Sequence, residues 1–151
     1  MRDIHGAIVA LVTPMTRTEE LNEAGLRSLV RHVMGGGVHG LFVNGTTGEF
    51  YSFDMAQKRR SLEIVMEESG GKIPVIAGAA AITTRMAIAE VKMAESMGAD
   101  AVTVLTPMFV GPNQEELYLH YKEIAESTTL PVLAYNNPAK TAVSFTPDTV
   151  S

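Results

Sequence analysis

Two adjacent hydroxyl side chains, Thr46 and Thr47, stand between two glycines in the segment GTTGE. Hydroxyls, together with backbone N–H groups that glycines leave open, can hold a carboxylate. Further along the chain, Tyr135 and Lys140 occur in the segment YNNPAKT. A tyrosine next to a threonine can relay a proton, so these residues predict carboxylate binding coupled to proton transfer. On residue types alone, Thr46 and Thr47 could equally be turn residues, and Tyr135 a core tyrosine with a satisfied hydroxyl.

Five short apolar runs must position these residues. They are nearly continuously apolar, as parallel strands buried on both faces are. Their spacing of 26 to 34 residues leaves room for a helix in each connection. Ligands of parallel α/β folds bind at the carboxyl ends of the strands, so we expect Thr46 and Tyr135 at one edge of a sheet. The runs begin near Ile8, Leu41, Val75, Ala101 and Val132.

Apolar stripes at helical spacing fill the four connections. Asn22 is a candidate N-cap of the first helix, Gly98 a candidate stop of the third, and Asn113 with Glu116 resembles a capping box before the fourth. The segment TPDTVS (146–151) predicts the first turn of a further helix. The stripes comprise Leu26, Leu29, Val30 and Val33, then Met55, Leu62, Val65 and Met66, then Ala87, Val91 and Ala94, and lastly Leu117, Tyr121, Ile124 and Ala125.

The alternation of strand and helix predicts the α/β class, either a doubly wound sheet or a (β/α)8 barrel. Eight units of this length need about 250 residues, the usual size of a barrel. In the barrel interpretation, residues 1–151 are the N-terminal portion of a single domain. The glycines Gly35, Gly37 and Gly40 match the G-x-G-x-x-G spacing, but they follow a predicted helix and precede a strand. That order is the reverse of a dinucleotide site, so we interpret them as a helix stop and turn.

Composition narrows the function classes. The net charge is −5 without a basic cluster, so we expect no nucleic-acid partner. Cysteine is absent, which excludes disulfides, thiolate metal sites and a cysteine nucleophile. The apolar run 8–12 is too short for a signal peptide or a membrane span, so we expect a cytoplasmic protein without membrane contact. The four histidines form no metal-binding pattern and are expected on the surface or on helices: His5, His32, His39 and His120.

Five segments occur together in this order in a known family. With them, the chain resembles the dihydrodipicolinate synthase/N-acetylneuraminate lyase family of (β/α)8 Schiff-base enzymes, over essentially its whole length. The resemblance implies a TIM barrel, of which this chain covers roughly the first five β/α units. The segments are GAIVALVTPM (6–15), GTTGE (45–49), IPVIAG (73–78), TVLTP (103–107) and YNNPAKT (135–141).

The resemblance also implies an activity, that of a lyase forming a Schiff base with pyruvate. The first expectation is a 4-hydroxy-tetrahydrodipicolinate synthase of lysine biosynthesis, which joins pyruvate to an aldehyde by aldol condensation. A 2-keto-3-deoxy sugar acid aldolase or dehydratase, or an N-acetylneuraminate lyase-like enzyme, is the alternative. The partners would be pyruvate or another 2-keto acid with an aldehyde-type second substrate, and relatives suggest a homo-oligomer, a dimer or tetramer.

Site residues follow from the resemblance by position. Thr46 and Thr47, with Gly48 beside them, would meet the pyruvate carboxylate, and both threonines would take part in the proton relay. Tyr135 would be the central acid/base. In addition, Ala10 would line the pyruvate pocket, and Lys140 falls where synthase members carry an arginine that grips the second substrate's carboxylate.

Three features depart from the family pattern. The imine-forming lysine lies on the sixth strand, which would come after Ser151, so we expect this chain alone to be inactive. No separate cofactor is expected, since the imine forms on a protein lysine. Lysines present in the chain are expected on helices, in a turn or on a loop, where they cannot replace it: Lys58, Lys72, Lys92, Lys122 and Lys140.

Phe109 is the second departure, because many synthases place there a tyrosine that reaches into the neighbouring subunit's site. Lys140 is the third, since lysine cannot form the bidentate fork that arginine gives a carboxylate. Together they favour a relative acting on a 2-keto-3-deoxy acid or another aldehyde partner. A non-catalytic half-barrel that binds a small carboxylate, or associates through its open strand edges, is a further alternative.

Overall fold

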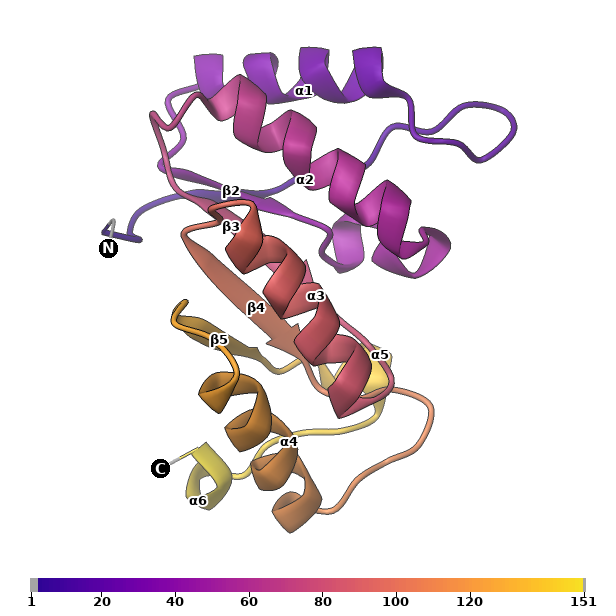
Figure 1. Cartoon of the computed structure of the whole chain (residues 1–151), viewed down its shortest axis with the longest axis vertical. Helices are drawn as coiled ribbons and strands as arrows, with labels where there is room; N and C mark the ends of the chain where they lie inside the picture. The colour runs from indigo at the N-terminus through magenta and orange to yellow at the C-terminus, as the bar shows by residue number, and fades with distance from the viewer. Residues whose placement is uncertain (1–2, 151) are drawn as a thin grey trace.

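The computed structural model describes residues 3–150, which form one sheet of five parallel strands with helices between them (Figure 1). Each strand begins at or next to a run predicted from the sequence, so the strand predictions are confirmed. The strands are β1 (Ile8–Ala10), β2 (Gly40–Val43), β3 (Val75–Ala79), β4 (Ala101–Leu105) and β5 (Val132–Tyr135).

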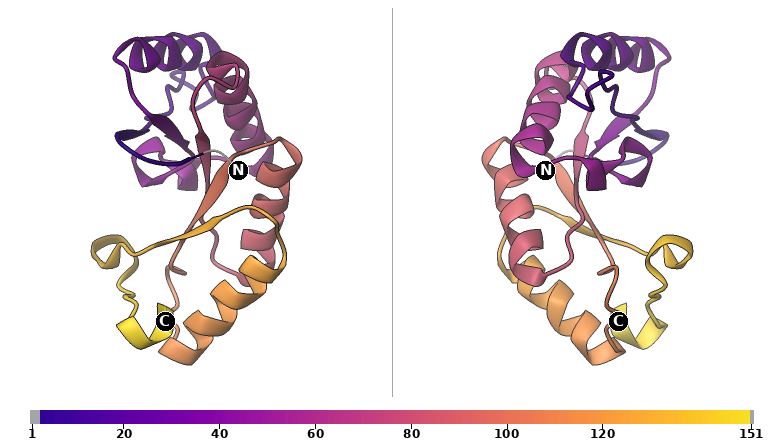
Figure 2. Two further views of the ribbon diagram at one scale, coloured as in Figure 1. Left: turned by 90° about the vertical axis from the view of Figure 1, so that its left-hand side faces the viewer. Right: turned by 90° about the vertical axis from the view of Figure 1, so that its right-hand side faces the viewer.

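The order of the strands decides between the two predicted folds. Every strand pairs with the next one in the chain, in the order β1-β2-β3-β4-β5, and all four pairs are parallel. A doubly wound sheet reverses its order at a switch point and carries helices on both faces. Here the order never reverses, and the four long helices lie in an arc along one side of the curved sheet (Figure 2). The architecture is that of the first five units of a (β/α)8 barrel.

Four long helices connect the strands: α1 (Glu23–Gly35), α2 (Met55–Ser69), α3 (Thr84–Ser96) and α4 (Gln114–Glu126). Their ends follow the predicted signals. The Asn22 side chain accepts a hydrogen bond from the Gly25 amide at 2.9 Å, and Asn113 forms a capping box with Glu116. Gly98 lies just after α3 with φ +79°, a left-handed conformation that glycine adopts without strain.

Two stripe residues are more exposed than predicted. Met55 is 41% exposed because it begins α2, directly after the capping residue Asp54 and beyond the part of the helix that packs on the sheet. Ala125 is also exposed, since it faces a groove beside β5 that no described residue fills. The remaining stripe residues are buried or partly buried.

Short helical turns occupy several strand ends and connections. The threonine pair lies in η1 (Thr46–Gly48), followed by η2 (Phe50–Ser52). Lys140 lies on a short helix, α5 (Pro138–Thr141), and not on the loop that we predicted, because Pro138 at the first helical position fixes φ for a helical turn. α6 (Pro147–Val150) confirms the predicted turn of a further helix, although Ser151 lies outside the described residues.

The glycine-rich segment before β2 is a helix stop and turn, as predicted. Gly35 is the last residue of α1, Gly37 takes φ +75° in the turn, and Gly40 begins β2. These glycines therefore serve the connection and do not open a helix onto a phosphate site.

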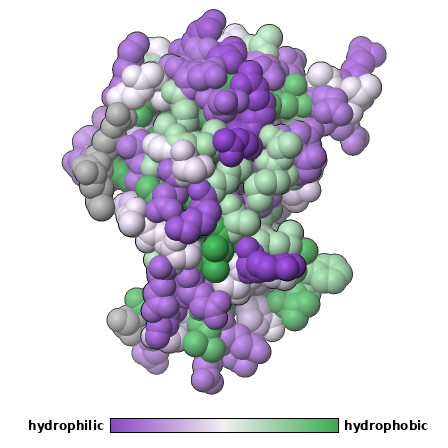
Figure 3. All heavy atoms as spheres, viewed as in Figure 1, coloured by the Kyte–Doolittle hydropathy of each residue, from purple (hydrophilic) through white to green (hydrophobic). Residues whose placement is uncertain are grey.

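The core lies between the sheet and its helices and includes Leu26, Leu41, Leu62, Val91 and Ile124. Figure 3 shows hydrophilic residues over α1 and α2, and apolar side chains gathered in the lower half of the same face. Exposure rises at the two edges of the sheet: β3 is buried throughout, whereas β1 and β5 contain exposed positions. Within residues 3–150, no helix is long and apolar enough to cross a membrane.

Candidate active site

The carboxyl end of β2 turns sharply at Asn44, which is buried and has φ +59°. Asparagine tolerates this left-handed conformation better than most residues. Its side chain is held from α2: Nδ2 donates to the Lys58 carbonyl at 3.0 Å, and Oδ1 accepts from the Ser61 hydroxyl at 2.7 Å. The turn brings Gly45 and the threonine pair to the carboxyl edge of the sheet.

Thr46 and Thr47 differ in their surroundings. The Thr46 hydroxyl oxygen is buried and has no hydrogen-bond partner among the described residues. Thr47 is exposed. Leaving a buried hydroxyl without a partner lowers the free energy of unfolding by about 1–3 kcal/mol. A ligand that bonds to the Thr46 hydroxyl would remove this cost, because the hydroxyl can both donate and accept.

Gly48 is packed against the end of β1. Its carbonyl accepts a hydrogen bond from the Thr13 hydroxyl at 2.7 Å. A Cβ atom on Gly48 would lie 2.9 Å from the Leu11 carbonyl oxygen, so only glycine fits without a shift of the backbone. Gly48 therefore fixes the loop against the neighbouring strand.

Tyr135 ends β5 and is partly buried. Its ring packs against that of Phe42 in a T-shaped contact with 6.4 Å between centroids, and its hydroxyl oxygen accepts a hydrogen bond from Asn137 Nδ2 at 3.1 Å. The phenol uses a lone pair in that bond and keeps its own O–H proton available, as a proton carrier requires.

A small cavity joins Thr46 to Tyr135. It is lined also by Phe42, Gly78 and Leu105 among others, and its volume of about 10 Å³ leaves room for about one water molecule. A neighbouring cavity of about 140 Å³ is lined by Thr46, Phe50, Leu105 and Lys140, together with Tyr51, Met108 and Thr141. Thr46 lines both cavities, whereas Tyr135 lines only the first and Lys140 only the second, so the structure places these three predicted site residues around two neighbouring cavities.

The other predicted site residues lie apart from these cavities. Ala10 ends β1 with an exposed position, and neither Ala10, Thr47 nor Gly48 lines the two cavities. Phe109 is 95% exposed and takes φ +79°, which is rare for a non-glycine residue. Its ring therefore points into solvent in this chain.

As predicted, Lys58, Lys92 and Lys122 lie on helices and Lys72 in a turn, whereas Lys140 lies on α5 and not on a loop. None lines the cavity shared by Thr46 and Tyr135. Lys72, Lys92 and Lys122 are exposed, while Lys58 is buried on α2 and paired with a carboxylate. Among residues 3–150, no three His, Asp or Glu side chains gather in a way that could hold a metal ion.

Sequence reasoning missed a buried ion pair beneath the site, between Lys58 and Glu90. Lys58 Nζ lies 2.6 Å from Glu90 Oε1, and the two side chains are only 10% and 5% exposed. A signal was present, because Glu90 stands three residues after Ala87 and Lys58 four residues before Leu62, both inside the apolar stripes. A charge within such a stripe indicates a buried polar contact.

His120 is a helix residue, as expected, but it is buried. Its Nδ1 lies 2.9 Å from the Thr84 hydroxyl, so it ties α4 to the start of α3. Burial lowers the pKa of this imidazole, and the charge of Glu123 opposes the shift. His120 lines neither of the two cavities that Thr46 lines, which points to a structural role.

Comparison with known proteins agrees with this geometry. The profile of the Dihydrodipicolinate synthetase family matches residues 3–151. A 4-hydroxy-tetrahydrodipicolinate synthase of Methanopyrus kandleri is 42% identical over 149 residues, which is 98% of this chain and 50% of that protein. The chain spans about half the length of the curated relatives it matches.

Solved structures give the same result. The chloride-inhibited dihydrodipicolinate synthase of Acinetobacter baumannii, in complex with pyruvate, has a TM-score of 0.95 and 39% identity, covering 97% of this chain and 50% of that one. A prophage protein of the dihydrodipicolinic acid synthase family from E. coli K12, also in complex with pyruvate, has a TM-score of 0.92 and 29% identity, covering 96% and 49%. With this fold, this strand-end geometry and a profile match over nearly every residue, the chain belongs to the dihydrodipicolinate synthetase family.

Proposed function

We propose that the protein acts as a pyruvate-dependent Schiff-base lyase of the 4-hydroxy-tetrahydrodipicolinate synthase type, to which this chain contributes the half-barrel that holds the keto acid's carboxylate. In this reaction a lysine amine condenses with the ketone of pyruvate, with loss of water. The imine then loses a proton from its methyl carbon, and the enamine so formed adds through that carbon to an aldehyde, whose oxygen takes up a proton.

Thr46 holds the carboxylate from the cavity that it lines with Tyr135, and Tyr135 transfers protons to and from the intermediate. From the family resemblance we assign Thr47 and Gly48 to the same carboxylate and Thr47 also to the proton relay. We likewise assign Ala10 to the wall of the pyruvate pocket in the complete barrel, although these three residues line neither cavity of this chain.

The observation that carries this proposal is the Thr46 hydroxyl. It is buried without a partner among the described residues, and it lines a cavity together with Tyr135. A carboxylate oxygen in that cavity would satisfy the hydroxyl, and the phenol proton of Tyr135 would lie across the same space. Family members crystallised with pyruvate, from Acinetobacter baumannii and E. coli, support this ligand class.

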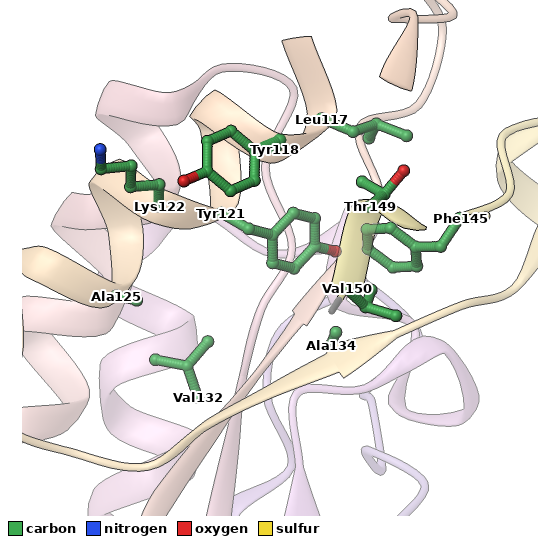
Figure 4. A pocket seen from close by; sticks show the side chains of 10 residues that line it. All are labelled: Leu117, Tyr118, Tyr121, Lys122, Ala125, Val132, Ala134, Phe145, Thr149 and Val150. Atoms are coloured by element: carbon green, nitrogen blue, oxygen red, sulfur yellow. The ribbon is translucent and has the colours of Figure 1, made fainter. Parts of the chain in front are cut away.

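We further propose that residues 1–151 are the N-terminal half of one barrel domain. An apolar groove of about 360 Å³ runs beside β5, lined by side chains from α4, β5 and the segment around α6 (Figure 4). In Figure 4 the rings of Tyr121 and Phe145 lie side by side on the wall of this groove, in an edge-to-face contact with centroids 4.8 Å apart. A further helix followed by a sixth parallel strand would fill the groove and pair with the free edge of β5.

The imine-forming lysine then lies on that second half. This agrees with the lysines present, since none of those described lines the cavity of Thr46 and Tyr135. The experiment is borohydride trapping with pyruvate, followed by mass spectrometry, on the 151-residue chain alone and on the chain co-expressed with the second half of a relative's barrel. We expect a pyruvyl-lysine adduct only in the co-purified complex, and on the added half.

Two results would count against the proposal. An adduct on a lysine of this chain would overturn the placement of the imine. A complex that co-purifies, binds pyruvate and forms no adduct would overturn the Schiff-base mechanism and favour a half-barrel that only binds a carboxylate.

A second candidate is a 2-keto-3-deoxy sugar acid aldolase or dehydratase, or an N-acetylneuraminate lyase-like enzyme. Two residues favour it. Phe109 has no hydroxyl with which to extend the proton relay, and Lys140, on the wall of the larger cavity, offers a point charge in place of a bidentate fork. Comparing aspartate semialdehyde with 2-keto-3-deoxy acids as turnover partners of the complete enzyme separates the two candidates.

We also propose a cytoplasmic homo-oligomer, a dimer or tetramer. The exposed side chains of Phe109 and Val110, at 95% and 69%, support a protein contact at the loop between β4 and α4. Sedimentation velocity of the complete enzyme tests the assembly, and a monomer at micromolar concentration would contradict it.

A further inference from the structure

The buried pair of Lys58 and Glu90 lies outside the cavities of Thr46 and connects α2 to α3. Taking two charges out of water is costly, and replacing a buried ion pair with apolar residues is often neutral or stabilising. Stability alone therefore gives a weak reason for placing charges inside two apolar stripes. The contacts that the two residues make beyond each other indicate another role.

Glu90 holds the end of β3. While Oε1 pairs with Lys58, Oε2 accepts a hydrogen bond from the Ala80 amide at 2.9 Å. Ala80 follows the last residue of β3 and lines the cavity of Thr46 and Tyr135. The carboxylate thus fixes the point at which the backbone leaves the sheet, at one wall of the cavity.

Lys58 holds the end of β2. Its main-chain carbonyl accepts the 3.0 Å hydrogen bond from Asn44 Nδ2, and Asn44 is the residue whose left-handed turn starts the threonine loop. The ammonium of Lys58 also lies over the ring of Phe50, 5.4 Å from its centroid, and Phe50 lines both cavities. One residue of α2 therefore contacts two parts of the site.

The two strand ends are in close contact at this point. A Cβ atom on Gly78 of β3 would lie only 2.1 Å from the Asn44 carbonyl oxygen, so no side chain separates them. Where two backbones meet this closely, a small displacement of either one changes the position of Thr46. Their relative position must be held from outside, and α2 and α3 lie behind these strands.

We propose that Lys58 and Glu90 are positioning residues, which set the spacing between the ends of β2 and β3 and so place the Thr46 hydroxyl. The main-chain carbonyl of Lys58 fixes the end of β2 by accepting from Asn44. Its ammonium binds the Glu90 carboxylate, which in turn fixes the end of β3. The ligand that Thr46 meets rests on the function proposed above, but the spacing itself does not depend on it.

The test compares four variants of the ¹⁵N-labelled chain by NMR. Glu90→Leu removes the acceptor of the Ala80 amide, so exchange of that amide should become about tenfold faster, as loss of a charge-assisted hydrogen bond implies. Glu90→Gln keeps an acceptor oxygen, so the Ala80 amide should exchange as slowly as in the parent chain. Lys58→Met/Glu90→Gln leaves neither charge of the pair, and it removes the ionic link to α2 together with the cation over the Phe50 ring. Lys92→Met is the matched control, because it removes an exposed ion pair from the same helix α3.

Pyruvate is then titrated while the amides of Gly45, Thr46 and Ala80 are followed. In the double variant we expect slow exchange of the Ala80 amide to persist and the chemical shifts of the Gly45 and Thr46 amides to change. The pyruvate concentration at half-saturation should rise about fivefold or more. In the Lys92→Met control, all three quantities should match the parent chain. The urea midpoint of each variant shows whether it is still folded, which separates local effects from loss of folding. If Glu90→Leu does not fold, the positioning role is tested with the double variant alone. Unchanged Gly45 and Thr46 signals in the double variant would overturn the proposal. If the parent chain alone does not bind pyruvate, the titration is repeated on its complex with the second half of the barrel. Absence of binding there would overturn the carboxylate site, while the amide signals of the chain still test the positioning role.

Discussion

Substituting Gly78 by alanine probes the contact on which the site is built. Gly78 lies in β3, pairs with Thr103 of β4, and faces the turn at Asn44. The added Cβ would stand 2.1 Å from the Asn44 carbonyl oxygen and 2.8 Å from its carbonyl carbon, whereas ordinary van der Waals contact begins at 3.4 Å. Both are backbone atoms, so no side chain can rotate away.

The expected cost follows from this geometry. Overpacking a well-packed interior costs about 1–3 kcal/mol. Relief here also requires one strand to move within a parallel ladder, where each hydrogen bond contributes about 1 kcal/mol. We therefore expect Gly78→Ala to lower the free energy of unfolding by about 3 kcal/mol, a large part of the 5–15 kcal/mol typical of a domain.

Urea denaturation followed by circular dichroism measures this change. Gly35→Ala is the matched control: Gly35 is the last residue of α1, and nothing lies within 4 Å of an added Cβ. Alanine is the better helix former, so the control should raise the free energy of unfolding by up to about 1 kcal/mol. If Gly78→Ala unfolds within about 0.5 kcal/mol of the parent chain, the inferred contact between the ends of β2 and β3 is wrong.

Three further changes test the site and its support. Thr46→Val keeps the shape of the side chain and removes a hydroxyl that has no partner among the described residues. Urea denaturation should therefore show a free energy of unfolding higher by up to about 1 kcal/mol, while NMR titration should show weaker pyruvate binding. Tyr135→Phe removes a proton carrier from the complete enzyme, so steady-state kinetics should show a larger loss in kcat than in pyruvate KM; a change in KM alone would contradict the role. The pKa of His120 is lowered in the folded chain, so the unfolded chain binds a proton at this imidazole more readily. The stability that neutral His120 contributes is therefore present above the ordinary pKa of about 6.5, and it is lost as the pH falls below that value. Urea midpoints at pH 7.5 and 5.5 should therefore differ less for His120→Gln than for the parent chain, and equal differences would refute this assignment.

Local patterns predicted the elements well because each depends on nearby residues. The buried strands are continuous apolar runs, and Asn22 and Asn113 cap helices through amides only three residues away. The motif that contains Thr46 and Thr47 predicts where a carboxylate would meet the chain, and this stays a prediction. Sequence spacing did not settle the choice between a barrel and a doubly wound sheet, since that depends on which strands pair in space.

Contacts between distant residues were beyond local patterns. Lys58 and Glu90 are 32 residues apart, and nothing near either residue indicates its partner. The exposure of Met55 and Ala125 depends on where a helix extends past the sheet or faces an unfilled groove. The Thr46 hydroxyl has no hydrogen-bond partner among residues 3–150, and this could be known only once its neighbours in space were placed. The proposed function depends on this feature.

The strict succession of strand pairing has a consequence for how this sheet forms. Each strand pairs with the strand made immediately before it, so every pairing closes a loop of similar length, and the entropy of closure is nearly the same at each step. A sheet of this kind can grow strand by strand as the polypeptide leaves the ribosome. In a complete barrel, only the last pairing, which returns to β1, must join the two ends of the domain, so we expect that step to be the slowest in folding.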